Sequence, residues 1–574
     1  MTKKITLLSL CFLSIVSAYA QNIELVSDKG NTVTLISGGY YLSPRTEVVN
    51  GITYHKFSKD FTCLMEKGAP ALPVERASVM VANNGNVTVD VSYDHYDEYQ
   101  GMEILPSKGS LKRNVKPSDV LYEFGAAYNQ DAFYPGTLAE AGSPYILRDT
   151  RGVTVSVYPY QYNPVTKVLR IYYDITVKVI TAGNGGNQKS GSVIGANSAF
   201  SKIYANHYIN ARTANLGDEE PLAPEMLIVA PDTYVTHLTA LANWKVESGI
   251  KTIITPLSEV GSTPEGIKAY IQEYYAENPG LVYVLLAGDH QNLPSYSYGI
   301  SGGGEALWSD TYYAQLEGDD FYPEVLIGRF SGTTYDVDNM VSRTLEYETA
   351  PLEGDWMTRV VGIGSNEGDG YGDDGEPDWQ HLRNIGNKLL ANGYTYAYEF
   401  FDGSHGENDG EESPANYMIS DAVNDGVGLI NYTGHGATNE FSTGAYTNTH
   451  VYGLTNAGMY PFVVSVACNN GTFTTGTSIC EAWLTTQNQG VPTGAIAACG
   501  SSILMAWAEP MQTQDEMTEL IIRTNPDVKK YALGDLFYSG QLSMLQTYNE
   551  SATAIEIMQT WVFFGDPSVT YRNA

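Results

Sequence analysis

The chain has 574 residues, of which 43% are hydrophobic and 17% are charged, a composition typical of a globular protein with two or three domains. This composition excludes a disordered chain and a collagen-like repeat. The 32 basic and 65 acidic side chains give a formal net charge of −33, which would repel a nucleic acid or an anionic membrane surface. We therefore expect no nucleic-acid partner.

The first twenty residues predict a signal peptide. Two lysines, Lys3 and Lys4, precede an apolar run from Ile5 to Val16, and small residues follow at the cleavage positions, Ala18 and Ala20. The mature chain would then begin directly after residue 20. No later stretch approaches the ~18 unbroken apolar residues of a membrane helix, so we expect a secreted protein without a transmembrane segment, in the medium, at the cell surface or in the periplasm.

Residues 21–212 predict a β-rich domain. Short alternating or β-branched runs such as Ala77–Val81 and Val153–Tyr158 are separated by turn-forming residues. A Gly/Asn/Ser-rich stretch over 181–195 is typical of an exposed linker, and a second exposed stretch, acidic and proline-bearing, begins at Arg212. We place the domain boundary at Arg212, so that residues 213–574 form the second domain.

Residues 213–574 predict an α/β domain. Unbroken apolar runs of strand length alternate with helical patterns, which indicates a mostly parallel sheet covered by helices on both faces. The predicted strands are 226–230, 251–257, 281–288, 359–365, 428–434, 462–467 and 494–499. In such sheets ligands bind beyond the carboxyl ends of the strands.

Chemically reactive side chains follow several of these predicted strands. These residues are Asp289 and His290, Asn366 and Glu367, His435, Cys468, and Ser501. We expect their side chains to meet at one edge of one sheet.

Cys468 and His435 predict a nucleophile and its proton carrier. A thiol with a pKa near ~8.5 needs an imidazole or a helix terminus to become a thiolate at neutral pH. Gly436 follows His435 directly, so its backbone amide and that of Cys468 could form an oxyanion hole for an acyl oxygen. Two other cysteines, Cys480 and Cys499, fall in apolar segments typical of buried, inert thiols.

The same segments resemble the catalytic domain of the gingipain family of cysteine peptidases, which has a caspase-like fold. The resemblance runs from about Met226 to Arg572 and is carried by NYTGHGA (431–437), THVYGLTN (449–456), SVACNNGTF (465–473) and WAEPMQTQDEM (507–517). It implies that Cys468 is the nucleophile, His435 the general acid and base, and Glu367 the acidic residue that supports the histidine.

Substrate specificity is implied by the same resemblance. Asp378 falls where the arginine-specific members place a carboxylate at the base of the primary pocket, and Trp507 and Met511 fall where they line its walls. A carboxylate and an indole suit a guanidinium. Arg212 lies in the exposed junction, where such an enzyme could cut off its own N-terminal region. The open alternatives for Asp378 and Trp507 are an exposed acidic loop and a core tryptophan.

The N-terminal region carries a resemblance of its own. KGAPALPVERASVMV (67–81) is similar to a stretch of the pro-domains that precede these peptidases. We therefore expect residues 21–212 to be a pro-domain that inhibits the enzyme. A carbohydrate-binding or adhesive β domain remains open.

An oxygen-rich segment, LEGDDFYPE (316–324), predicts a calcium site. Calcium takes six to eight oxygen ligands. Asp289, Asp320 and Glu324 could supply carboxylates, and Glu317 and Tyr322 could supply carbonyl oxygens; the resemblance implies structural calcium in the matching place. No P-loop, dinucleotide fingerprint or zinc spacing is present in the sequence, so we expect no redox or nucleotide cofactor.

The predicted function is that of a secreted cysteine endopeptidase, made as a zymogen, which cleaves after arginine through a thioester on Cys468. Its substrates would be proteins or peptides. Two alternatives stay open: a transpeptidase or sortase-like enzyme of the same fold, and an exported binding protein without turnover.

Overall fold

The computed structural model describes residues 23–57, 61–189, 198–211, 222–523 and 531–573. The predicted signal peptide, residues 190–195 of the predicted linker and Arg212 lie outside the described residues.

The N-terminal region is built of β-strands, as predicted. One sheet has the order β1-β2-β13-β6, a second has the order β5-β10-β8 with β9 also on β10, a third has the order β11-β12-β7, and β3 and β4 form a hairpin. Their bounds are β1 (Ile23–Asp28), β2 (Thr32–Ser37), β3 (Arg45–Val49), β4 (Ile52–Lys56), β5 (Glu75–Val81), β6 (Asn86–Ser92), β7 (His95–Gln100), β8 (Ala139–Ala141), β9 (Tyr145–Leu147), β10 (Thr150–Val157), β11 (Tyr160–Asn163), β12 (Val168–Tyr173) and β13 (Ile175–Ala182).

The second domain is organised around a ten-stranded sheet, which confirms the predicted α/β class. Its strand order is β15-β14-β16-β19-β30-β29-β26-β22-β20-β21. The bounds are β14 (Glu225–Ala230), β15 (Lys251–Pro256), β16 (Leu281–Ala287), β19 (Leu326–Phe330), β20 (Arg359–Gly364), β21 (Tyr396–Phe401), β22 (Leu429–Thr433), β26 (Phe462–Val466), β29 (Ala497–Ser501) and β30 (Trp561–Phe564). Shorter strands outside this sheet are β17 (Tyr296–Ile300), β18 (Ala306–Ser309), β23 (Gly436–Ala437), β24 (Glu440–Phe441), β25 (Tyr446–Thr447), β27 (Gln487–Asn488) and β28 (Val491–Pro492).

The sheet consists of two parallel halves that run in opposite directions. Every neighbouring pair is parallel except β29 and β30, which pair antiparallel with Ser501 opposite Trp561. The carboxyl ends of β20, β22 and β26 therefore share one edge, whereas that of β16 lies at the opposite edge. The expectation that Asp289 and His290 join the other reactive residues at one edge was wrong, because the apolar pattern of a strand does not reveal its direction.

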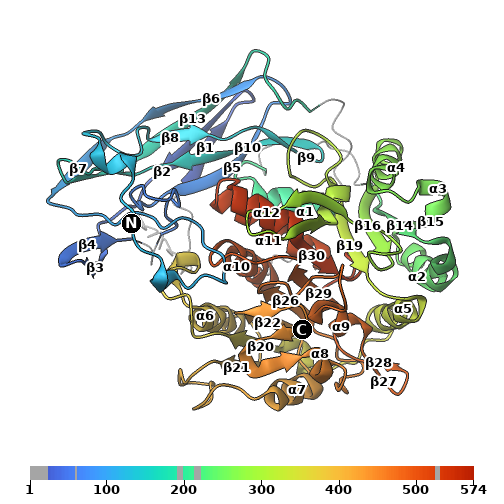
Figure 1. Cartoon of the computed structure of the whole chain (residues 1–574). Coiled ribbons are helices and arrows are strands. Elements are labelled where there is room, and N and C mark those ends of the chain that lie inside the picture. Colours follow the sequence, from blue (N-terminus) through green and yellow to red (C-terminus); the bar gives the residue numbers. More distant parts are fainter. Residues whose placement is uncertain (1–22, 58–60, 190–197, 212–221, 524–530, 574) are drawn as a thin grey trace, which may run out of the picture.

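Helices cover both faces of this sheet (Figure 1). Several begin at side-chain caps that satisfy their first free amides: Thr263 caps α4, Thr333 caps α5, and Ser478 caps α9 together with Glu481. The helices are α1 (Ser198–His207), α2 (Val235–Glu247), α3 (Leu257–Val260), α4 (Pro264–Glu277), α5 (Thr334–Thr349), α6 (Asp378–Ala391), α7 (Asn416–Asp425), α8 (Asn448–Val451), α9 (Ile479–Thr485), α10 (Glu509–Ile522), α11 (Leu533–Thr547) and α12 (Ala552–Thr560).

The N-terminal region is docked onto the α/β domain and shares its core. In Figure 1 its sheets lie above the large sheet, with α1 and α11 between them. Tyr145 and Leu147 of β9 and Phe200 of α1 belong to the same continuous hydrophobic core as the strands of the α/β domain. Two smaller cores lie within the N-terminal region itself.

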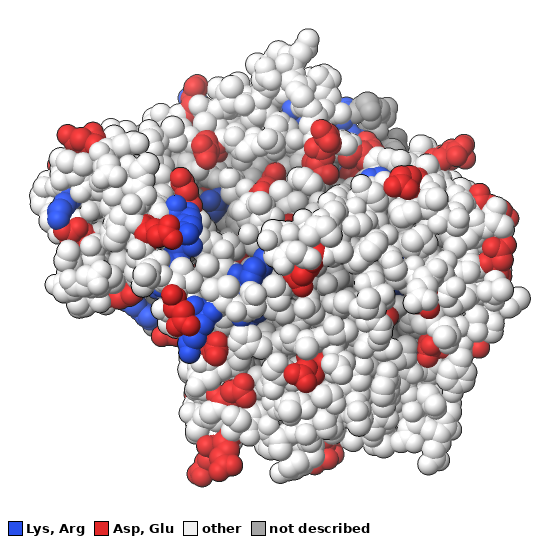
Figure 2. Space-filling view, in the orientation of Figure 1, with Lys and Arg blue, Asp and Glu red and all other residues white. Residues whose placement is uncertain are grey.

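Charge complementarity adds to this apolar contact. Figure 2 shows acidic side chains spread over the molecule and basic ones gathered along the hollow between the two parts. Several cations of the N-terminal region bind the α/β domain. Among them, Lys112 pairs with Glu556, Lys189 pairs with Glu317, and buried Arg148 donates to backbone carbonyls, including that of Glu324 at 2.8 Å. The two parts therefore form one compact unit.

Among the helices of the described residues, none is both long enough and apolar enough to cross a membrane.

Candidate active site

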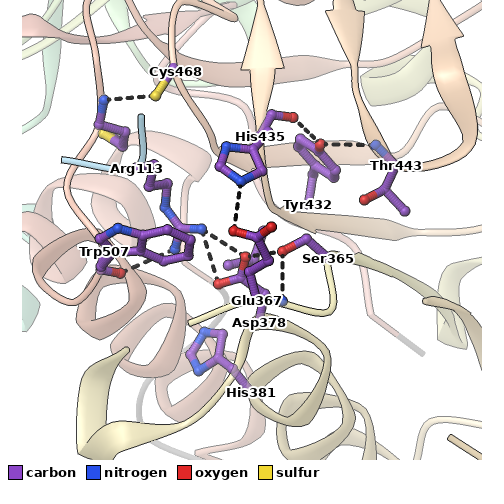
Figure 3. Close-up of polar contacts among 12 residues, drawn as sticks. Arg113, Ser365, Glu367, Asp378, His381, Tyr432, His435, Thr443, Cys468 and Trp507 are labelled. Atoms are coloured by element: carbon purple, nitrogen blue, oxygen red, sulfur yellow. Dashed lines mark hydrogen bonds and ion pairs between the residues drawn. The ribbon is translucent and has the colours of Figure 1, made fainter. Parts of the chain in front are cut away.

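Cys468 lies just beyond β26, in a tight connection where Asn469 has a positive φ of 60°. Its side chain is buried, and its Sγ accepts a hydrogen bond from the backbone N–H of Met505 at 3.3 Å (Figure 3). Burial raises the pKa of the Cys468 thiol, against the opposing effect of nearby Arg113 and Lys112. In this arrangement the thiol is kept protonated to a higher pH than a free cysteine.

His435 follows β22, the strand next to β26, and Glu367 follows β20 on the other side of β22. The Nε2 atom of His435 lies 3.2 Å from Oε2 of Glu367, at hydrogen-bond distance, and both side chains are 39% exposed. The three residues therefore come from three adjacent parallel strands that end at the same edge. Figure 3 shows the imidazole between the carboxylate and the cysteine.

Asn470 connects the cysteine segment to the histidine segment. Its fully buried amide donates to the carbonyls of Ala437 at 2.6 Å and Glu440 at 2.8 Å, and accepts from Ser465 Oγ at 2.8 Å. A Cβ atom at Gly436 would lie 2.9 Å from the Cys468 carbonyl oxygen, which is too close. A glycine is thus required for the two segments to approach. The predicted oxyanion role of the amides of Gly436 and Cys468 stays a prediction.

Asp378 opens α6 and lies at the base of a pocket that contains Arg113 of the N-terminal region (Figure 3). The Nη1 atom of Arg113 donates to both carboxylate oxygens at 2.9 Å, and Ser365 Oγ donates to one of them at 2.6 Å. The guanidinium carbon is 4.8 Å from the ring centroid of Trp507. Both side chains of the ion pair are 0% exposed, so the pocket is closed around a guanidinium.

The backbone around Arg113 adds a short strand to the α/β domain. Lys112 pairs antiparallel with Ala506, Arg113 N–H donates to the Met505 carbonyl at 2.8 Å, and Trp507 N–H donates to the Leu111 carbonyl at 3.0 Å. Extended peptides are commonly recognised in this way. The strand is held beside Cys468, because Met505 also donates its own N–H to the Cys468 sulfur.

The chain turns sharply after Arg113. The N–H of Val115 donates to the carbonyl of Lys112 at 2.9 Å, which closes a turn with Arg113 and Asn114 at its centre. The indole N–H of Trp507 donates to the carbonyl of Val115 at 3.0 Å and fixes this reversal.

Comparisons with known proteins agree with this arrangement. The model of Peptidase family C25 matches residues 219–572, and that of Propeptide_C25 matches residues 48–207. The chain belongs to peptidase family C25. It is 36% identical over 519 residues to gingipain R1 of Porphyromonas gingivalis, covering 89% of this chain and 50% of the relative, so it spans about half of that relative's length.

Two solved structures from the family are similar. The crystal structure of the Arg-specific cysteine proteinase gingipain R has a TM-score of 0.56 and 34% identity, with 62% of this chain and 79% of that chain covered. The complex of the Porphyromonas gingivalis RgpB pro- and mature domains has a TM-score of 0.56 and 34% identity, with 61% and 80% covered. The predicted C25 fold, with a preceding β-rich propeptide, is thereby confirmed.

Two of the three predicted pocket residues of this C25 chain contact the guanidinium, and the third does not. Asp378 and Trp507 contact Arg113 as described, whereas Met511, fully buried on α10, packs its thioether against Gly372 in the loop before Asp378. Met511 therefore packs against the loop that precedes Asp378, not against the guanidinium of Arg113.

The five predicted calcium ligands do not form one cage in this arrangement. Asp320 accepts from Ile146 N–H and the Asn187 amide, both at 2.7 Å, and Glu317 pairs with Lys189. Of the others, Glu324 accepts from the backbone amides of Leu316 and Glu317, Tyr322 donates to Glu550, and Asp289 accepts from Asn292. Among the described residues no group of three or more His, Cys, Asp or Glu side chains is placed to hold a metal ion. The carboxylates as placed therefore form no calcium cage, and the predicted contribution of the Glu317 and Tyr322 carbonyl oxygens stays a prediction.

Four residues of the site escaped the sequence reasoning: Arg113, Ser365, Asn470 and Met505. Arg113 had a usable signal, since a Lys-Arg pair stands in the turn-forming stretch GSLKRNVKPS (109–118) of a region expected to inhibit an arginine-directed enzyme. The others act through a backbone amide (Met505), a hydroxyl (Ser365) and a side-chain amide (Asn470), contacts that leave no pattern in the sequence.

We expect Glu367→Gln to lower kcat/KM for peptide hydrolysis about ten- to a hundredfold, less than the loss of a general acid–base group itself. A neutral amide at this position stabilises a charged imidazole less than a carboxylate does, so the loss should appear in kcat, with KM little changed. Glu411→Gln, an exposed change on a nearby loop, is the matched control. Equal kinetic constants for the two variants would show that Glu367 does not support catalysis by His435.

Proposed function

We propose that this chain is the latent precursor of a secreted cysteine endopeptidase that cleaves peptide bonds after arginine. The observation that carries the proposal is the burial of Arg113 against Asp378 and Trp507, directly beside Cys468 and His435. A pocket that encloses a guanidinium next to a thiol and an imidazole suits hydrolysis after an arginine side chain.

The residues suggest the following chemistry. His435 takes the proton of the Cys468 thiol, and the sulfur attacks the carbonyl carbon of the bound arginine. The imidazolium then gives that proton to the leaving amine as the C–N bond breaks. Water, deprotonated by His435, then breaks the C–S bond and frees the carboxylate and the thiol. Glu367 keeps the imidazole oriented and stabilises its charged form.

Latency follows from how Arg113 is held. It fills the pocket as a substrate arginine would, but the turn from Lys112 to Val115 leads the chain away from the extended path of a substrate. The two parts are also held together by contacts distant from this turn, such as those of Arg148 and Lys189. Residues 21–212 would then be a built-in inhibitor, with Arg212 as a cleavage point that separates it.

The signal-like first twenty residues support export. The proposed substrates are proteins or peptides with accessible arginines. Calcium dependence remains a prediction, and loss of activity on chelation, restored by calcium, would support it.

Arg113→Ala is expected to make the full-length precursor active. Removal of one partner of a buried, hydrogen-bonded charge pair costs about 2–5 kcal/mol of binding, or about 30-fold to several thousandfold weaker inhibition. The initial rate of hydrolysis of an arginyl fluorogenic peptide by the intact chain measures this. Lys116→Ala, an exposed lysine of the same loop, is the control and should stay latent. If the Arg113→Ala precursor shows no activity although its matured form is active, Arg113 is not the group that inhibits the precursor.

The proposal is tested with fluorogenic peptides that differ only in the residue before the scissile bond, on protein freed of its N-terminal region. Hydrolysis should follow arginine, with lysine and neutral residues at least about tenfold slower. Fast cleavage after a neutral residue would refute the pocket assignment.

A further inference from the structure

The residue before Arg113 occupies a place of its own on the α/β domain. Successive side chains of an extended strand point to opposite sides. Arg113 enters the Asp378 pocket, and Lys112 therefore projects the other way, where its ammonium contacts Glu556 of α12.

Two groups of the α/β domain bind the Lys112 ammonium. The Nζ atom is hydrogen-bonded to the Glu556 carboxylate, and it donates to the carbonyl of Leu504 at 3.1 Å. The side chains of Lys112 and Glu556 are 29% and 21% exposed, so the pair is partly withdrawn from water. A fixed carboxylate and a carbonyl on the same side suit a primary ammonium.

The two acceptors are held in place without the N-terminal region. Glu556 lies inside α12, where its carbonyl accepts from Thr560 Oγ1 at 2.6 Å. Leu504 precedes the segment that pairs with Lys112, and its N–H donates to the Glu305 carboxylate at 2.9 Å. A second negative charge therefore lies close to this site, and a substrate strand that pairs with Ala506 would place its own side chain here.

We propose that Glu556 selects a basic residue, lysine above all, immediately before the cleaved arginine, so that dibasic segments are the best substrates. This inference rests on the proposed function, because the enzyme must first cleave after arginine. Lys112 and Arg113 then mimic a dibasic substrate across two subsites. The partial exposure of the ion pair limits the preference to about three- to tenfold in kcat/KM.

The test uses three fluorogenic peptides that end in Lys-Arg, Ala-Arg or Glu-Arg and are otherwise identical. Matured wild-type enzyme should hydrolyse Lys-Arg about three- to tenfold faster than Ala-Arg, and Glu-Arg more slowly than Ala-Arg. In E556Q the Lys-Arg to Ala-Arg ratio should fall to about one, and in E556K Glu-Arg should become the better substrate. Because each readout is a ratio within one preparation, the folded fraction of a variant does not affect it.

The matched control is E277Q, an exposed glutamate at the end of α4, whose ratios should equal those of the wild type. Equal rates of Lys-Arg and Ala-Arg with the wild type, or a ratio unchanged in E556Q, would overturn this inference and leave the proposed function intact. Failure to cleave any of the three peptides would overturn both.

Discussion

Replacement of Cys468 by alanine is expected to abolish peptide hydrolysis, with kcat reduced on the order of 10⁶-fold, the scale for loss of a protease nucleophile. The sulfur lies beside Met505, whose carbonyl pairs with the strand that carries Arg113, so no other described thiol is placed to replace it. Cys480 and Cys499 are buried, and burial raises the pKa of both, which keeps them protonated. Steady-state hydrolysis of an arginyl peptide after removal of the N-terminal region measures the effect.

Cys499→Ala is the appropriate control, since it removes a buried sulfur of β29 at a small cost in packing. We expect it to keep most of the wild-type rate. A Cys468→Ala protein with measurable thiol-dependent turnover would refute the assigned nucleophile, and equal losses in both variants would indicate damage to the fold.

Asp378→Asn is expected to remove the preference for arginine. In the buried pocket the carboxylate accepts from Arg113 and from Ser365, and the uncharged amide cannot balance a guanidinium. Loss of one partner of a buried charge pair costs about 2–5 kcal/mol, so kcat/KM for arginyl peptides should fall about 30-fold to several thousandfold. Slow hydrolysis of peptides with neutral residues at this position should persist, because Cys468 and His435 are unchanged.

The matched control is Asp369→Asn, an exposed carboxylate of the same loop, which should leave the kinetics near wild type. An Asp378→Asn enzyme that still prefers arginine over neutral residues would show that the guanidinium of a substrate is bound elsewhere. The same variant should also weaken latency, because Arg113 would lose its partner.

Cys468 and His435 could be predicted from the sequence because each follows an unbroken apolar strand, whereas the role of Glu367 was implied by the family resemblance. The sheet places β20, β22 and β26 side by side, and Glu367 and His435 meet as the resemblance implied. The strand predicted over 494–499 lies further along the chain, since β29 covers Ala497–Ser501. Consequently Ser501, predicted beyond a strand, lies within one.

Contacts between distant segments could not be predicted. Because β29 pairs antiparallel with β30, the carboxyl end of β16 lies at the opposite edge of the sheet from those of β20, β22 and β26. No local sequence pattern encodes the direction of a strand. Among the carboxylates assigned to calcium, that of Asp320 accepts hydrogen bonds from Ile146 and Asn187 of the N-terminal region. Arg113 and Asp378 are 265 residues apart, and only the docked fold brings them together.

The most direct test of a Cys468 peptidase that is blocked by its own Arg113 is covalent labelling with a peptidyl-arginine chloromethyl ketone, located by mass spectrometry. The thiolate displaces chloride and forms a stable thioether. We predict one adduct, on Cys468, in the matured enzyme and in the Arg113→Ala precursor, with almost none in the wild-type precursor or with an alanine analogue. Equal labelling of the wild-type precursor, or an adduct on another residue, would contradict the account.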